Sequence, residues 1–131
     1  MPPDARSTIR LWHDALNRGD VGALVTLVHP QVEIGGPRGS TRGVDVLAEW
    51  FDRARVRLWP RRWFGSDGQV VVEETGEWLS FQGGETLSSQ RVATAFTVND
   101  EGLITRIVRH DALEAALEDC CLTLEDQFEF E

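Results

Sequence analysis

The fold is decided by residues 87–119, which read LSSQRVATAFTVNDEGLITRIVRHDALEAALED. Residues 87–98 are rich in Val, Thr and other residues typical of strands, and they predict one long strand. The next four residues, NDEG, predict a tight hairpin turn into a second strand over residues 103–110. Residues 111–119 return to helical spacing, and Asp111 is positioned to cap that helix. The stretch therefore predicts a hairpin followed by a short helix.

Two further strands precede this hairpin. Residues 55–59, RVRLW, alternate charged and apolar side chains, which predicts a strand, and Pro60 places that strand at a sheet edge or at a bulge. The Asp67-Gly68 pair predicts a tight turn, and residues 69–79 predict the next strand. The four strands together predict an antiparallel meander.

Helices dominate the chain before the meander. We expect a first helix from Asp4, its N-cap, to about Asn17, with Gly19 ending it. A second helix is expected over residues 20–29, because Pro30 disfavours helical backbone in the residue before it. Residues 44–54 predict a third helix, since their apolar side chains recur at helical spacing. A short strand with the sequence QVEI separates the second helix from the third.

Helices followed by strands predict the α+β class, with the helices covering one face of one sheet. We expect a cone-shaped α+β barrel, in which a strongly curved antiparallel sheet wraps around three N-terminal helices and leaves a pocket between them. Pro60 and Gly76 suit such curvature. Residues 1–119 are expected to form this single domain, and residues 120–131 an acidic tail that is either frayed or laid on a partner.

Composition excludes several kinds of chemistry. All thirteen basic residues are arginine, so Schiff-base and P-loop lysine chemistry are excluded, and the absence of tyrosine removes any phenolic acid. The net charge is −9, and residues 111–131 hold eight acidic residues and no basic one. Residues 1–110 thus carry −1, from 13 basic and 14 acidic residues, which argues against nucleic acid as a partner. The arginine-rich run over residues 53–62 predicts an exposed edge balanced by nearby acids.

The chain shows no signal peptide and no apolar run long enough to span a membrane, so we expect a soluble, cytoplasmic protein without membrane partners. The adjacent Cys120 and Cys121 are expected to stay reduced, since vicinal disulfides are strained. The three histidines lack the close spacing of metal ligands, and no metal site is expected.

Residues 32–43, VEIGGPRGSTRG, hold glycines at positions 35, 36, 39 and 43. This spacing fits neither G-x-G-x-x-G nor a P-loop, and Pro37 removes a backbone amide that a phosphate cradle would use. The segment is instead expected to form a glycine-rich rim or lid over the pocket, with Arg38 or Arg42 close to it.

His110 and Asp111 are the candidate catalytic residues, because both can move protons and both lie at the end of the last strand. Neighbouring strand residues point to opposite faces, so at most one of the two faces the pocket. One register turns Ile104, Arg106, Val108 and His110 inward, and the other turns Leu103, Thr105, Ile107, Arg109 and Asp111 inward. The alternative to a catalytic role is that Asp111 caps the helix and His110 packs over it.

Aromatic residues on separate elements are expected to converge around the pocket, where they suit a flat or apolar ligand. Side chains alternate along a strand, so either Glu73 or Glu74 faces inward. That carboxylate either serves as an acid with a raised pKa or forms a salt bridge with Arg62 or Arg91, and we favour the salt bridge. The predicted ligand-binding residues are Trp12, His13, Leu16, Arg42, Trp50, Trp63, Glu74, Trp78 and Phe96. No cofactor is expected.

Three segments resemble the nuclear-transport-factor-2-like superfamily, within its SnoaL-like and ketosteroid-isomerase-like branch. They are LWHDALNRGDVGALVTLVHPQVEI at residues 11–34, TRGVDVLAEWF at 41–51 and VNDEGLITRIVRHDALEAAL at 98–117. The resemblance implies a pocket protein that commonly forms a homodimer through the open sheet face. It also implies that Asp111, or His110 in its place, occupies the position of the carboxylate that serves SnoaL-like cyclases as general acid or base.

Two functions remain open. The first is binding of a small apolar or aromatic molecule, with cofactor-free acid/base isomerisation, cyclisation or dehydration where the protein is an enzyme. The second is a non-catalytic dimeric binding or scaffolding module. A steroid isomerase of the Tyr/Asp type is not expected, because the chain has no tyrosine and places Ile34 or Gly35 where those enzymes carry the proton-shuttling Asp.

Overall fold

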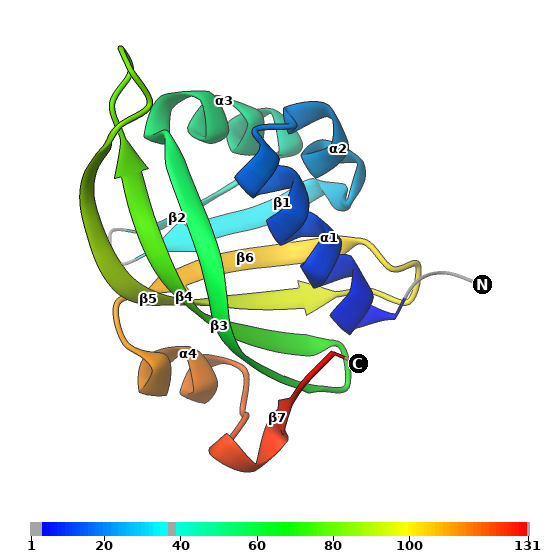
Figure 1. Ribbon diagram of the computed structural model, residues 1–131. Coiled ribbons are helices and arrows are strands. Elements are labelled where there is room, and N and C mark those ends of the chain that lie inside the picture. Colours follow the sequence, from blue (N-terminus) through cyan, green and yellow to red (C-terminus); the bar gives the residue numbers. More distant parts are fainter. Residues whose placement is uncertain (1–3, 37–38, 131) are drawn as a thin grey trace.

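The computed structural model describes residues 4–36 and 39–130 (Figure 1). Its helices are α1 (Ala5–Arg18), α2 (Val21–Thr26), α3 (Val44–Ala54), α4 (Leu113–Asp119) and a short 3₁₀ helix, η1 (Leu124–Asp126). Its strands are β1 (Val28–Gly36), β2 (Gly39–Arg42), β3 (Val56–Ser66), β4 (Gln69–Leu79), β5 (Thr86–Val98), β6 (Ile104–His110) and β7 (Gln127–Phe128). Among the described residues, no helix is long and apolar enough to cross a membrane.

The seven strands form one curved sheet in the order β2-β1-β6-β5-β4-β3-β7. Helices α1, α2 and α3 lie on its inner side and α4 lies on the opposite side (Figure 1). The predicted α+β class and the curved sheet around N-terminal helices are confirmed. The sheet does not close, because β2 and β7 remain at its two edges. It is also not antiparallel throughout, since β1 pairs with β6 in parallel.

Helix α1 has the predicted ends. The carboxylate of Asp4 accepts from the amide of Ser7 at 2.8 Å, and Gly19 ends the helix in the left-handed region at φ 75°. Helix α2 is shorter than expected, because the chain leaves the helix at Thr26 and Val28 already pairs with Ile104. The predicted helix end at His29 was therefore wrong. Residues from Val28 onward pair with β6, although the position of Pro30 alone allows a helix as far as His29.

The meander has the predicted strand order and the predicted Asp67-Gly68 turn, but β3 continues through Pro60 to Ser66, beyond the predicted residues 55–59. Asp67 and Gly68 both have positive φ, at 50° and 81°, as a two-residue hairpin turn requires. Pro60 lies at a register shift between β3 and β4, which confirms the expected bulge. Strand β4 was predicted with both of its ends.

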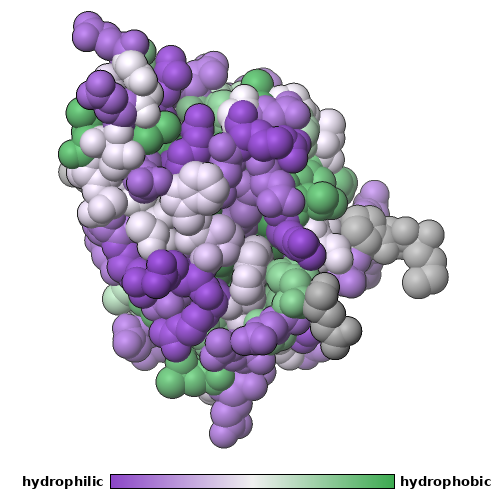
Figure 2. Space-filling view, viewed as in Figure 1, coloured by the Kyte–Doolittle hydropathy of each residue, from purple (hydrophilic) through white to green (hydrophobic). Residues whose placement is uncertain are grey.

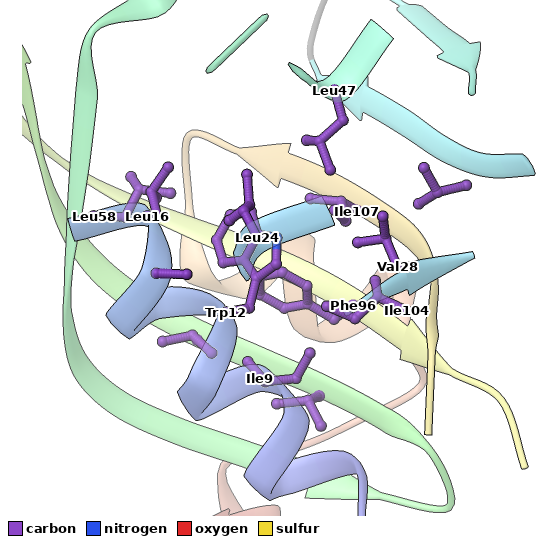
Figure 3. Packing of buried hydrophobic residues seen from close by; sticks show 14 of the residues in the cluster. Ile9, Trp12, Leu16, Leu24, Val28, Leu47, Leu58, Phe96, Ile104 and Ile107 are labelled. Atoms are coloured by element: carbon purple, nitrogen blue, oxygen red, sulfur yellow. The ribbon is translucent and has the colours of Figure 1, made fainter. Parts of the chain in front are cut away.

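The main core lies between α1 and the inner face of the sheet (Figure 3). Trp12 points from α1 toward Phe96 on β5, and their ring centroids lie 5.1 Å apart in an edge-to-face arrangement. Leu16 and Leu24 pack beside them and are fully buried. A second, smaller cluster lies under α4 on the outer face, where Ala116 and Leu117 cover Ala95.

The acidic C-terminal segment packs on the chain's own sheet. Thr123 and Asp126 form a capping box at η1, and Phe128 pairs with Trp63 at the β3 edge. The ring of Phe130 lies 4.9 Å from the ring of Trp63, and Arg6 of α1 lies over Phe128 at 4.1 Å. Residues 120–130 thus contribute a short edge strand that the sequence pattern did not predict. Most of the molecular surface on the side that shows α1 and β3 is hydrophilic (Figure 2).

Candidate functional site

A partly open cavity of about 900 Å³ lies between α3 and the inner face of the sheet. This volume lies in the range of small-molecule sites. Its lining is apolar in the interior and polar or charged toward the mouth. The lining residues are Trp12, Ile34, Gly35, Gly36, Gly39, Ser40, Thr41, Leu47, Trp50, Arg53, Val56, Leu58, Gln90, Thr94, Ile107, Arg109 and Asp111.

Strands β5 and β6 build one wall of the cavity. Thr94 and Arg109 are direct partners across these antiparallel strands, so their side chains lie next to each other on one face. Ile107 and Asp111 share that face with Arg109 because side chains alternate along a strand. The second of the two predicted registers is therefore the one that the structure shows near this end of β6.

Helix α3 builds the opposite wall. Leu47, Trp50 and Arg53 follow one another at intervals of three residues, which places them along adjoining sides of the helix. Leu47 is fully buried and Trp50 is half-buried. Arg53 in the last turn is exposed, so this wall changes from apolar to charged along its length.

Trp12 forms the floor together with Val56 and Leu58 of β3. The indole N–H of Trp12 is buried and has no hydrogen-bond acceptor among the described residues. Such an unpaired donor costs about 1–3 kcal/mol. The floor therefore holds one polar group that the surrounding side chains do not satisfy.

The glycine-rich segment expected as a rim or lid forms a β1–β2 hairpin, and six of its residues line the cavity. A Cβ added at Gly35 would lie 3.2 Å from Cβ of Ser40 and 3.4 Å from a methyl group of Val108, so glycine permits the close approach of these strands. Pro37 and Arg38 lie outside the described residues. Arg42 is exposed, lies outside the lining and is 3.4 Å from Glu33.

Asp111 lines the cavity and is solvent-exposed. The expectation that it caps the last helix was wrong. Helix α4 begins one residue later than predicted, its N-cap is Ala112, and no side chain caps it. From the position before the N-cap, the carboxylate of Asp111 makes no hydrogen bond to the first turn. It is the single carboxylate among the described lining residues.

His110 lies on the opposite face of β6, under α4. Its Nε2 is 2.9 Å from Oδ2 of Asp119, and Arg106 donates to both carboxylate oxygens of the same aspartate at 3.0 Å. Burial opposes the ionisation of Asp119, but these hydrogen bonds outweigh it, so the pKa of Asp119 lies below its usual value. His110 thus belongs to a polar cluster that fastens α4 to the sheet.

A buried polar network lies beneath the cavity floor. His13 Nε2 is 2.5 Å from Oε2 of Glu74, and Thr94 donates its hydroxyl to the other oxygen of Glu74 at 2.6 Å. All three residues are almost fully buried. Thr94 also lines the cavity, so it connects the cavity with this network. The expected salt bridge to Arg62 or Arg91 is found at Glu73, on the outer face.

The remaining predicted ligand-binding residues divide into three groups. Trp12 and Trp50 line the cavity directly. His13, Leu16, Trp63, Glu74 and Phe96 lie in the core behind it, and Trp78 stacks against Arg109, with the guanidinium carbon 5.6 Å from the ring centroid.

Sequence reasoning did not single out Arg53, Arg109 and Thr94 as site residues. Arg53 was treated as part of the basic run over residues 53–62. Arg109 belonged to one of the two predicted registers, and knowledge of the register alone would have identified it. No group of three metal-ligating side chains occurs in the parts of the chain that the structure describes.

The sequence profile of the SnoaL-like domain matches residues 9–107, which include most of α1, all of α2 and α3 and the cavity floor, while Arg109, Asp111 and α4 lie beyond the matched range. The chain belongs to the SnoaL-like family. No curated protein matches it significantly. Solved structures nevertheless share the fold of this SnoaL-like protein.

An NTF2-like protein from Cytophaga hutchinsonii is 14% identical, with a TM-score of 0.72, over 88% of this chain and 96% of that one. A candidate polyketide cyclase from Xanthomonas campestris pv. campestris is 22% identical, with a TM-score of 0.68, over 85% and 92%. RV0760c from Mycobacterium tuberculosis, solved in complex with estradiol-17beta-hemisuccinate, is 18% identical, with a TM-score of 0.70, over 95% and 98%. At these identities the SnoaL-like protein shares the fold with them, and its ligand must be inferred from its own residues.

Proposed function

We propose that this protein binds a flat, largely apolar small molecule in the cavity between α3 and the sheet. The observation that carries the proposal is the cavity itself, about 900 Å³ in volume, with Trp12 and Trp50 among its lining residues. Aromatic side chains pack well against flat rings and bury much apolar area. The estradiol-17beta-hemisuccinate complex of RV0760c supports the proposal, since a protein of the same fold holds a polycyclic molecule.

A catalytic role is the second candidate, and the position of Asp111 favours it. Its carboxylate is not used by the helix, lies at the cavity wall and can accept a proton from a bound molecule. We therefore propose Asp111 as the general base of a cofactor-free isomerase, cyclase or dehydratase. His110 is less suited to that task, because Asp119 engages it on the other face of β6.

Dimerisation and location also remain proposals. Helix α4 covers Ala93 and Ala95 in the middle of the outer sheet face, which leaves the parts of β3 and β4 that carry Trp59 and Glu77 for a second copy of the chain. Light scattering over a range of protein concentrations tests the homodimer: a mass of one chain throughout rules it out. The proposed compartment is the cytoplasm.

Binding is tested with N-phenyl-1-naphthylamine, an uncharged aromatic probe whose fluorescence rises in apolar sites. Gln90 lines the cavity from β5, and the neighbouring Ser89 points to the other face of the strand. Both positions are exposed, so tryptophan can be introduced at either one without disturbing the core. The proposal predicts saturable binding to the unsubstituted protein and to S89W, and loss of binding in Q90W. Equal binding by both variants, or no saturable binding, overturns it.

Catalysis is tested with 2-tetralone in deuterated buffer, because abstraction of a proton next to a carbonyl is a first step common to such reactions. We expect hydrogen–deuterium exchange faster than in buffer alone, and exchange at the buffer rate in D111N. Equal rates for the protein and for D111N exclude Asp111 as the base.

A further inference from the structure

The cavity wall carries two arginines that make no ion pair within the part of the chain that the structure describes. Among the described residues, ion pairs engage the side chains of Arg18, Arg42, Arg62, Arg91 and Arg106. Arg53 and Arg109 line the cavity and have no acidic group within 4.0 Å in the described ranges. Their positive charges come from opposite walls, Arg53 from α3 and Arg109 from β6.

Arg109 is positioned by its neighbours, but its guanidinium forms no ion pair with any described residue. The guanidinium carbon lies 5.6 Å from the centroid of the Trp78 ring, a cation–π contact that orients the side chain. Gly76 makes room for that ring, because a Cβ there would lie 3.0 Å from it. A ring face lacks hydrogen-bond acceptors for the five N–H donors of a guanidinium, so these donors remain free for a ligand.

The sign of charge in the cavity is opposite to that of the protein. The whole chain carries −9, and the acidic residues concentrate in its C-terminal part. Among the described lining residues the charged side chains are Arg53, Arg109 and Asp111, which sum to +1 (2 minus 1). A cavity with this charge favours an anion over a cation, although the chain as a whole is acidic.

We propose that the ligand is an aromatic or polycyclic monoanion of the carboxylate class, whose charged group Arg53 and Arg109 hold while its rings pack against Trp50. This inference rests on the proposed function. A planar guanidinium fits a carboxylate with two parallel hydrogen bonds. A single negative charge matches the net +1 of the lining, whereas a phosphate dianion exceeds it and meets the Asp111 carboxylate at the same mouth.

Two fluorescent probes separate the anion site from the apolar cavity. The probe 8-anilinonaphthalene-1-sulfonate has the ring system of N-phenyl-1-naphthylamine and adds one sulfonate, which stands in for the carboxylate. We expect the anionic probe to bind about ten-fold more tightly than the uncharged one at low salt, as a charge-assisted contact in a partly desolvated site allows. Raising the salt concentration should reduce this preference, because the cavity is partly open to solvent.

Three variants assign the preference to residues. R53Q and R109Q should each weaken binding of the anionic probe about five-fold and leave the uncharged probe unchanged. R91Q is the matched control: it removes the same charge from the outer face of β5, where Arg91 contacts Glu73 at 3.6 Å. R91Q should preserve the affinities of both probes. Thermal unfolding of each variant checks that the fold is retained.

The outcomes distinguish this inference from the proposed function. Binding of both probes with equal affinity, unaffected by R53Q and R109Q, overturns the anion site and leaves the apolar cavity standing. Failure of both probes, or binding that Q90W does not reduce, overturns the proposed function as well. An equal loss in R91Q and R109Q attributes the preference to overall charge, which also overturns the site.

Discussion

Nε2 of His13 on α1 lies 2.5 Å from Oε2 of Glu74 on β4, in a part of the core closed to solvent. Nδ1 of His13 is 2.9 Å from the carbonyl oxygen of Ile9. A carbonyl only accepts, so Nδ1 carries a hydrogen, and a single proton is shared between Nε2 and Oε2. The pair is therefore neutral as a unit. Burying a neutral pair avoids most of the cost that an isolated charge would carry.

The neutrality of the His13–Glu74 pair determines the effect of substitutions at Glu74. In E74Q the amide donates to Nε2 of a neutral imidazole and accepts from Thr94, so we expect a change in unfolding free energy within about 1 kcal/mol. E74A leaves Nε2 without a partner and opens a cavity, which should cost about 3–5 kcal/mol. Urea unfolding measures both. An E74Q variant as unstable as E74A would show that the pair requires two full charges.

Substitutions at His110 and Asp111, which are adjacent at the end of β6, should change the stability of the fold to different extents. H110A removes a hydrogen bond to Asp119 under α4 and should lower stability by about 1 kcal/mol. D111N should stay within about 0.5 kcal/mol of the unsubstituted protein, because Asp111 is exposed and caps nothing. Thermal unfolding at neutral pH compares the two. A destabilised D111N would restore the capping role that the structure excludes.

Glu73 should make stability depend on pH in the acid range. The hydrogen bond from Arg62 holds the pKa of Glu73 below its usual value near 4.5. The unfolded chain thus binds more protons as pH falls through this range, and the contribution of Glu73, present above pH 4.5, is lost on acidification.

We expect only a small contribution from this pair, because the Arg62 side chain is 43% exposed and water screens its charge. E73Q should flatten the pH dependence of unfolding below neutrality. E49Q, at an exposed position of α3 without an ion pair in the described residues, removes the same charge and should not. Parallel curves for the two variants would contradict the assignment.

The two cysteines should differ sharply in reactivity. Cys120 is buried at the C-terminal end of α4, and burial raises the pKa of its thiol to about 11. Cys121 is exposed. A thiol reagent at pH 8 should therefore modify one thiol of the folded protein quickly and the second only after unfolding, which absorbance and mass spectrometry can follow. Rapid modification of both would show that α4 leaves the sheet easily.

Local patterns predicted the elements whose ends depend on nearby residues. Asp4 and Gly19 define α1, and Asp67-Gly68 defines the β3–β4 turn, because capping and positive φ are properties of single positions. The prediction of the boundary between α2 and β1 was wrong, because that boundary depends on the pairing of Val28 with Ile104, which is far away in the sequence.

The candidate site was predictable only where local sequence patterns determine the position of a residue. The aromatic residues Trp12 and Trp50 followed from helical spacing. The choice between His110 and Asp111 required the register of β6, and the site role of Arg109 depended on the same register. Arg53 is a candidate site residue because it lines the cavity and has no carboxylate near it among the described residues. A local sequence pattern does not reveal either property.

A crystal structure of the protein grown with N-phenyl-1-naphthylamine tests the central claim most directly. We expect density for the probe inside the cavity, with its rings against Trp50. A cavity filled by rearranged side chains, or a probe bound only elsewhere on the molecule, would contradict it.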